Sequence, residues 1–145
     1  MTIYTSLGYG IAKAHKAMRA HFQEILRPYG VTVPQFEVMR ILKTESGLTA
    51  AQLVERIISD SSTIMSILQR LKSKSLIRRK ADESDRRQKL IYLTKEGELL
   101  LDNLAVLVDR HYEQMHDRCT PEELEIFRRV LSKLCGFCQT DKENI

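Results

Sequence analysis

The sequence predicts a mostly α-helical protein with one small β-hairpin, contained in a single domain. Three observations support this prediction. Apolar residues recur every three or four positions over most of the chain, which is typical of helices with one buried face. Two short segments, residues 76–80 and 89–93, enclose a charged loop and predict a pair of strands. A chain of 145 residues suits one domain and leaves little room for a second.

The first two predicted helices are separated by a turn. The first carries one apolar face and ends where Pro28 and Gly30 interrupt it. The second begins after Thr32, because Thr32 and Gln35 form the signature of a capping box and Pro34 suits a first helical turn. The apolar face of the first helix consists of Ile11, Ala14, Met18, Phe22, Ile25 and Tyr29.

A third and a fourth helix follow as a close pair. Thr49 and Gln52 repeat the capping signature and open a short third helix. Asp60 can cap the fourth helix, and two helices joined by a short polar turn have the dimensions of a helix-turn-helix. The predicted buried face of the fourth helix consists of Ile64, Ile67, Leu68 and Leu71.

Two long helices follow the hairpin. Thr94 caps the first of them, and Thr120 with Glu123 opens the second, with Pro121 at its first position. Both helices are apolar over a wide arc and therefore need partners on both sides. We expect a second subunit to supply the missing surface, the alternative being a self-contained bundle. The apolar residues are Leu100, Leu101, Leu104, Leu107, Val108, Tyr112, Met115, Leu124, Phe127, Val130, Leu131, Leu134 and Phe137.

The positive charge of the chain is concentrated in one short segment. Residues 70–95 hold ten Lys or Arg and three acidic residues, whereas the rest of the chain holds 13 basic and 16 acidic residues. Such an asymmetry indicates a polyanionic partner, most often nucleic acid.

Nothing in the sequence predicts a membrane segment or an exported protein. The longest apolar run has five residues, 104–108, and is too short to cross a bilayer. Lys13, Lys16 and Arg19 lie where a signal peptide would need its apolar stretch. Three cysteines do not make a disulfide framework and fit a reducing compartment. We therefore expect a cytoplasmic protein.

The fourth predicted helix has a polar face opposite its core. Short polar side chains let a helix approach another surface closely, and a helix in the major groove needs such donors and acceptors to meet the base edges. The alternative is a plain solvated face, but this helix lacks the alternating Glu and Lys of such faces, and the basic hairpin follows it directly. The face consists of Ser62, Ser66, Gln69 and Ser73, flanked by Ser61, Thr63 and Arg70.

The loop of the hairpin places Asp85 two residues before Arg87. An arginine at a loop tip can enter the narrow minor groove, where the negative potential is strongest, and a nearby aspartate can hold it in place. The alternative is an exposed ion pair of little energetic consequence.

Three stretches of sequence carry a specific resemblance. They are Val31–Met39 (VTVPQFEVM), Asp60–Ile64 (DSSTI), and Asp85–Arg87 (DRR) followed by Leu93–Gly97 (LTKEG). In order and spacing they resemble the MarR family of bacterial transcriptional regulators, over roughly residues 8–137.

The resemblance implies a winged-helix fold in a two-fold dimer. Within a single chain of residues 1–145, residues 32–95 would form the DNA-binding lobe, and residues 1–31 and 96–145 the dimerisation region. The resemblance also implies a repressor of transcription that binds a pseudo-palindromic operator and is released by a small phenolic or other anionic ligand, or by oxidation. The expected partners are double-stranded DNA, a second copy of the chain and a small-molecule effector.

The resemblance assigns individual residues as well. On the recognition helix it places Ser61, Ser62, Thr63, Ser66, Gln69 and Arg70. Arg87 falls at the wing-tip arginine, and Asp85 is the residue that orients it. Ile58 and Ser66 depart from the residues usual in the family, which leaves the operator sequence open but not the mode of binding.

Two kinds of signal are considered. For oxidation, Cys119 beside Arg118 is the best candidate, because a reactive thiolate needs exposure and nearby positive charge. For a small molecule, the resemblance predicts a cleft where the first, second and fifth helices meet the DNA-binding lobe. The candidates, chosen for their placement, are Arg19, Phe22, Phe36 and Met39, of which the last three also fit a plain core.

No metal site and no cofactor are expected. His111 and His116 are five residues apart and point about 140° from each other on a helix, unlike the pair spaced by four that binds zinc. The chain has no glycine-rich phosphate loop, nucleophile elbow or HExxH motif, so we expect no enzyme. The alternative function is a winged-helix interaction module that docks on an acidic protein and binds duplex DNA weakly.

Overall fold

The computed structural model describes residues 6–57 and 60–140, with side chains up to Gly136. The chain divides into two compact units, one up to residue 107 and one from residue 108. Ile58 and the side chain of Phe137 lie outside the described parts. The elements are α1 (Leu7–Leu26), the 3₁₀ turn η2 (Arg27–Tyr29), α2 (Val33–Thr44), α3 (Ala50–Arg56), α4 (Ser61–Ser73), β1 (Ile77–Ala81), β2 (Lys89–Leu93), α5 (Lys95–His116) and α6 (Pro121–Thr140).

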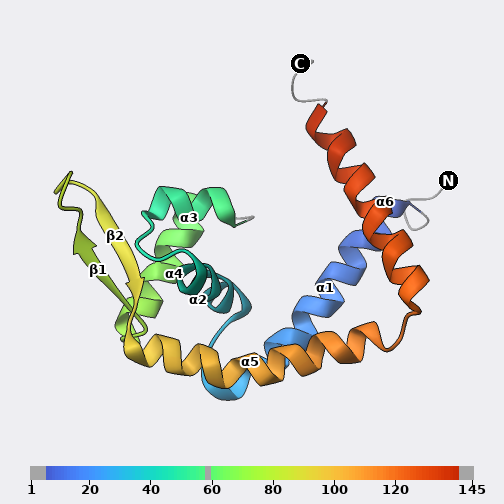
Figure 1. Cartoon of the computed structure of the whole chain (residues 1–145), viewed down its shortest axis with the longest axis horizontal. Helices are drawn as coiled ribbons and strands as arrows, with labels where there is room; N and C mark the ends of the chain where they lie inside the picture. The colour runs from blue at the N-terminus through green and yellow to red at the C-terminus, as the bar shows by residue number, and fades with distance from the viewer. Residues whose placement is uncertain (1–5, 58–59, 141–145) are drawn as a thin grey trace. The chain divides into compact units, whose positions relative to one another are not determined.

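The predicted fold class is confirmed, since the chain is mostly helical with one small β-hairpin. In the first unit α2, α3 and α4 pack on one another, and the hairpin extends from them as a wing (Figure 1). Among the described helices, none has the length and apolar content needed to cross a bilayer.

The predicted helix starts are confirmed by their caps. The Thr32 hydroxyl accepts from the Gln35 backbone amide at 3.3 Å, and the Gln35 side chain accepts from the Thr32 amide at 3.3 Å. Thr49 and Gln52 form the same reciprocal box at the start of α3. At α6 the Thr120 amide donates to Glu123 Oε2 at 2.8 Å. Each box satisfies two amides that have no partner inside the helix, which fixes where these helices begin.

The end of the first helix differs from the prediction. α1 ends at Leu26, and Tyr29 belongs to the following 3₁₀ turn, which Gly30 closes with a φ of 65°. Pro28 lacks the amide hydrogen that would continue the α-helical pattern, so the chain tightens before it turns. The predicted apolar face is only partly covered, because Phe22 is buried while Met18 is 44% exposed.

The core of the first unit forms where α2, α3, α4 and the strands meet. The predicted inner face of α4 is confirmed: Ile64, Ile67, Leu68 and Leu71 are all buried. The rings of Phe22 and Phe36 meet edge to face, 5.3 Å between centroids, and join α1 to α2. This packing leaves the opposite face of α4 directed outward.

The two strands pair antiparallel, with Arg79 opposite Ile91. A bridge from Leu48 adds a third segment, since the Ile91 amide donates to the Leu48 carbonyl at 2.8 Å. β1 begins one residue later than predicted, because Leu76 still belongs to the turn: its amide donates to the Leu71 carbonyl at the end of α4. The hairpin is thus attached to the helices at its base, as a two-stranded sheet of this size requires.

The end of α4 is fastened to the start of α5. The Thr94 hydroxyl donates to the Ser75 carbonyl at 2.6 Å and accepts from the Gly97 amide at 3.1 Å. A Cβ on Gly97 would lie 2.2 Å from the Leu76 carbonyl oxygen, so only glycine fits here without a backbone shift.

The second unit comprises the end of α5 and α6. Several large apolar side chains of α6 are exposed, with exposed fractions of 51% for Ile126 and 55% for Phe127. On the α5 side, Val108 and His111 are buried. Of the apolar residues predicted for α6, Phe127 and Val130 are exposed within the described chain, and so is Ile126, which was not among them.

Candidate nucleic-acid interface

The outward face of α4 is polar and exposed. It presents hydroxyl, amide and guanidinium groups on thirteen residues of regular helix, held in place by the buried face beneath. The structure brings all six predicted recognition-helix residues to the exposed part of this helix. They are Ser61, Ser62, Thr63, Ser66, Gln69 and Arg70.

Asp60 organises the first turn of α4. Its carboxylate accepts from the Ser62 hydroxyl at 2.6 Å, the Thr63 amide at 2.8 Å and the Thr63 hydroxyl at 2.9 Å. The hydrogen bond from Ser62, followed by the two from Thr63, lowers the pKa of Asp60 from 3.8 to about 2. Because both hydroxyls donate to Asp60, their oxygens are left to act as acceptors toward a ligand.

Met65 interrupts this polar surface and was not among the predicted site residues. Its side chain is 47% exposed, although every other large apolar residue of α4 is buried. The signal in the sequence was its phase: Met65 falls outside the spacing of Ile64, Ile67, Leu68 and Leu71, and so cannot share their face.

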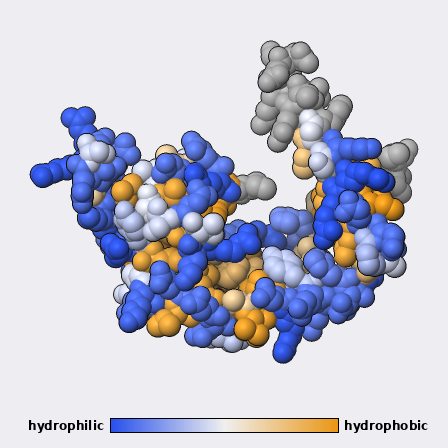
Figure 2. Space-filling model, viewed as in Figure 1, coloured by the Kyte–Doolittle hydropathy of each residue, from blue (hydrophilic) through white to orange (hydrophobic). Residues whose placement is uncertain are grey.

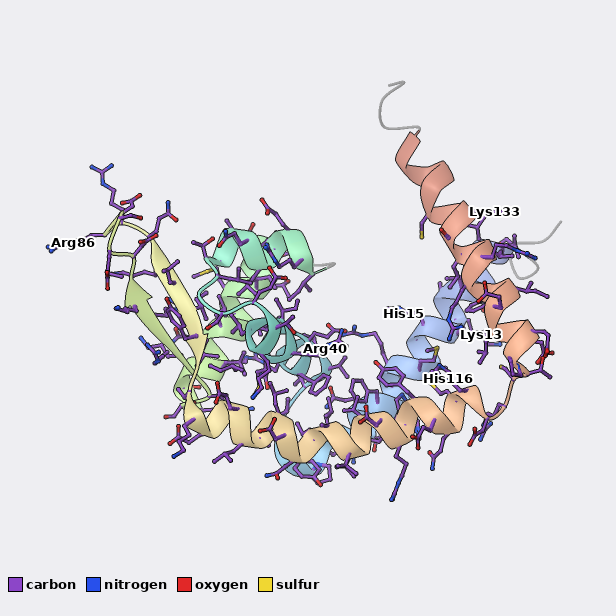
Figure 3. All side chains as sticks on the ribbon, in the orientation of Figure 1. Lys13, His15, Arg40, Arg86, His116 and Lys133 are labelled. Carbon is purple, nitrogen blue, oxygen red and sulfur yellow. The ribbon has the colours of Figure 1, made fainter. Side chains whose placement is uncertain are left out.

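The wing beside α4 is rich in cationic side chains. The Arg78 guanidinium lies over the Tyr92 ring, 4.6 Å from its centroid, which holds the base of the wing in place. Figure 2 shows mainly hydrophilic residues over the hairpin, and in Figure 3 the side chain of Arg86 points away from the tip of the hairpin. Arg87 is exposed in the same loop.

Asp85 contacts Arg87 through the main chain of the loop. Its Oδ1 accepts from the Arg87 backbone amide at 3.0 Å, and its Oδ2 accepts from the Gln88 side chain at 3.4 Å. Asp82 accepts in the same manner from the Ser84 amide at 2.9 Å. Asp85 therefore shapes the backbone of the loop at Arg87, whose side chain is exposed.

A cavity of about 410 Å³ lies where α1 meets α2, α3 and α4. Arg19 of α1 reaches across it to Glu37 of α2, with Nη1 and Oε1 3.0 Å apart. The lining residues are His15, Arg19, Pro34, Glu37, Arg40, Ile41, Arg56, Ile57, Thr63 and Ile67. His15 and Arg40 are labelled on α1 and α2 in Figure 3.

The structure separates the four residues predicted for a ligand cleft. Arg19 lines the cavity, whereas Phe22, Phe36 and Met39 do not line it and are buried in the core. Two further arginines of the lining, Arg40 on α2 and Arg56 on α3, were not among the predicted residues. Their convergence depends on how those helices cross, which no local spacing reveals.

The comparisons with known proteins agree with this architecture. The model of the MarR family matches residues 31–89, which run from the turn before α2 to the first residue of β2. The transcriptional regulator HosA of Escherichia coli O127:H6 is 32% identical over 104 residues, which make up 72% of this chain and 77% of HosA. The chain belongs to the MarR family.

Solved MarR-type structures share the fold along nearly the whole chain. A structure of Bordetella bronchiseptica BpsR, from work on the regulation of its DNA binding by 6-hydroxynicotinic acid, has a TM-score of 0.85 at 22% identity and covers 93% of this chain and 96% of BpsR. A MarR mutant from E. coli complexed with operator DNA has a TM-score of 0.85 at 21% identity, covering 92% of this chain and 99% of that one. The winged helix expected from the MarR resemblance is confirmed.

The last candidates to place in this MarR protein are those for sensing oxidation or a metal ion. Cys119 is exposed in the turn between α5 and α6, and its amide donates to the His116 carbonyl at 3.0 Å. Within residues 6–57 and 60–136, no three His, Cys, Asp or Glu side chains gather as metal ligands would. The redox role of Cys119 stays a prediction, as do the individual roles of the DNA-binding residues.

Proposed function

We propose that this MarR protein is a sequence-specific transcriptional repressor that binds a pseudo-palindromic operator as a homodimer. The observation that carries the proposal is the exposed polar face of α4 beside the cationic wing, within one unit built on a shared core. A helix of this kind fits the major groove, and an arginine-bearing wing fits the flanking minor groove. Residues 32–95 are the DNA-binding lobe in this proposal.

In the proposed complex each predicted residue has a distinct task. Ser66 and Gln69 face the base edges, whereas Ser61, Ser62 and Thr63 lie at the first turn, where hydroxyls reach phosphates or bases. Arg70 adds positive charge along the flank, and Arg87 enters the minor groove from a loop that Asp85 shapes.

In this proposal, two copies of the chain associate into a dimer. Residues 1–31 and 96–145 form the proposed dimerisation region, and exposed apolar side chains on α1 and α6 supply the surface that a partner would cover. They are Leu7, Ile11, Met18, Ile126, Phe127 and Val130. Two-fold symmetry would place the half-sites about 10 bp apart on one face of the duplex.

The cavity beside α4 supports control by a small anionic effector. Its size of about 410 Å³ falls in the range of ligand sites, and Arg19, Arg40 and Arg56 outnumber the acidic Glu37 in its lining. Thr63 and Ile67 of α4 form part of the wall, so a bound molecule would touch the recognition helix itself. The regulation of BpsR by 6-hydroxynicotinic acid makes aromatic acids a suitable first class to test.

An exposed arginine of the cavity offers the sharpest test of the effector. In a thermal-shift screen of aromatic carboxylates that includes 6-hydroxynicotinic acid, a compound that raises the melting temperature should also release DNA. Both effects should be lost in Arg40→Met, because Arg40 lines the cavity. They should be retained in Lys43→Met, one turn further along α2, which pairs with Asp102 instead.

The proposal includes action by binding rather than catalysis, and a cytoplasmic location beside the chromosome. The alternative, a module docking on an acidic protein, has no counterpart among the relatives named above. HosA is a transcriptional regulator, and the E. coli MarR mutant was solved with operator DNA.

The direct test is titration of duplex DNA of mixed sequence at low and moderate salt. Each phosphate neutralised by the protein contributes about −0.9 to the slope of log affinity against log salt concentration. We expect steep salt dependence for the wild type and a slope reduced by about one in Arg87→Ala. Arg118→Ala, a matched change in the exposed turn after α5, should bind as the wild type does.

Failure of the wild type to bind duplex DNA even at low salt would overturn the proposal and favour the protein-docking module. Binding that Arg87→Ala leaves unchanged would retain the regulator and reject the role of the wing tip.

A further inference from the structure

Met65 is an apolar side chain on a surface that otherwise offers hydrogen bonds. It lies on α4 next to Ser66 and one turn from both Ser62 and Gln69, all of which are exposed. About half of the Met65 side chain is open to solvent. The exposed half of this side chain can be removed from water only by an apolar partner from outside the chain.

The surface next to Met65 has the shape to receive such a partner. A hollow of about 430 Å³ opens between the start of α3, α4 and the wing, with Met65 and Ile91 in its lining. Ala50 and Ala51 line the α3 side, and most of the exposed lining surface is apolar. The polar residues of the lining are Thr49, Arg79, Gln88 and Lys89. Two of the three elements around this hollow, α4 and the wing, are those that face DNA in the proposed function.

The chemistry of the major groove identifies the partner. Guanine, cytosine and adenine present hydrogen-bond donors and acceptors there, whereas thymine also presents its C5 methyl group. Ser62, Ser66 and Gln69 can meet donors and acceptors, but Met65 cannot. An apolar side chain among them therefore distinguishes a base by its methyl group.

We infer that Met65 contacts the methyl group of one thymine in each operator half-site and is a specificity-determining residue. The inference rests on the proposed function, because it requires α4 to lie in the major groove. A methionine suits this task, since its unbranched side chain and polarisable sulfur adapt to an irregular apolar gap. The loss expected on removing one buried methyl group is about fourfold in affinity.

The test begins with selection of a high-affinity duplex from random DNA by the full-length wild-type protein. Each thymine of that duplex is then replaced singly by deoxyuridine, which removes only the methyl group. We expect the wild type to lose about fourfold in affinity at one thymine per half-site. Met65→Ser should bind the thymine and deoxyuridine duplexes equally at that position, while its response at every other position matches the wild type.

Two further variants keep the test decisive. Met65→Gln preserves the length of the side chain and should also lose the discrimination, so a folding defect of Met65→Ser would not hide the result. Glu55→Gln changes an exposed residue of α3 that does not line the hollow, and should leave the deoxyuridine profile as in the wild type.

The outcomes distinguish the role of Met65 from the proposed function on which it rests. If the wild type selects a sequence but all Met65 variants show its deoxyuridine profile, the role of Met65 is wrong and the regulator stands. If the wild type selects no sequence, the proposed function fails and the inference fails with it.

Discussion

Helices α4 and α6 are both amphipathic, but their apolar residues have different surroundings. On α4 the side chains of Ile64, Leu68 and Leu71 are fully buried within their own unit. On α6 the side chains of Ile126 and Phe127 are more than half exposed. The single chain therefore covers the apolar face of α4 and leaves apolar surface of α6 open, where our proposal places a second copy.

Defects in the two helices should therefore affect different quantities: the stability of a single chain for α4, and the association of two chains for α6. A defect under α4 weakens the fold of each chain by itself, so its cost does not depend on protein concentration. A defect on α6 should weaken association, so the loss of apparent stability should grow as the protein is diluted. The following predictions test this contrast, from the largest expected effect to the smallest.

Leu68→Ala should produce the largest loss. Leu68 is fully buried on the inner face of α4, and removing such a side chain typically lowers the free energy of unfolding by about 2–5 kcal/mol. Urea unfolding at two protein concentrations measures the loss, which should be the same at both. A loss well below 1 kcal/mol would show that α4 is not held by this core.

Phe127→Ser should weaken the dimer. A phenylalanine buried by a partner contributes about 1.5–3 kcal/mol through the hydrophobic effect, and Phe127 is 55% exposed in the single chain. Sedimentation equilibrium should show dissociation at concentrations where the wild type is dimeric. Lys133→Ser, a change at an exposed polar position of α6, should leave the association unchanged. An unaltered dimer in Phe127→Ser would remove α6 from the interface.

Gly97→Ala should disturb the connection between α4 and α5. Because the new Cβ would meet the Leu76 carbonyl oxygen at 2.2 Å, the backbone must shift, at a cost of about 1–3 kcal/mol in the free energy of unfolding. Gly10→Ala is the matched control, since a Cβ there meets nothing within 4 Å. Alanine in that helix should stabilise the protein by about 0.5–1 kcal/mol. Equal effects of both changes in thermal unfolding would contradict the close approach.

The smallest expected effect is a pH dependence from Asp60. Its pKa is about 2 in the folded chain against an ordinary value of 3.8, so its contribution to stability is full above about pH 5 and lost as the pH falls through 2. Asp60→Asn removes the titration. The melting temperature of the wild type should exceed that of Asp60→Asn at pH 6, and the difference should shrink steadily toward pH 2. A constant difference would show that the carboxylate charge does not stabilise the first turn of α4.

The helix starts and the buried face of α4 could be predicted from the sequence. Capping boxes at Thr32, Thr49 and Thr120 act within four residues, so their positions in the sequence determine the helix starts. The inner face of α4 follows from helical spacing alone. In both cases the deciding contacts are local or periodic.

Contacts of the candidate sites that depend on packing could not be predicted from the sequence. Phe36 and Arg40 both lie on α2, yet only Arg40 lines the cavity, because the crossing of α1 over α2 decides which face opens. Asp85 binds a backbone amide rather than a guanidinium, since the loop folds back on its own main chain. Such outcomes follow from three-dimensional geometry that residue spacing does not specify.

The most direct test of the account is a hydroxyl-radical footprint of the full-length protein on the duplex it selects from random DNA. If α4 and the wing bind DNA in each of two copies, protection should occur in two symmetric patches with centres about 10 bp apart on one face. Arg87→Ala should weaken protection at the outer edge of each patch, where the wing would enter the minor groove. A single patch without two-fold symmetry, or no protection at low salt, would contradict the account.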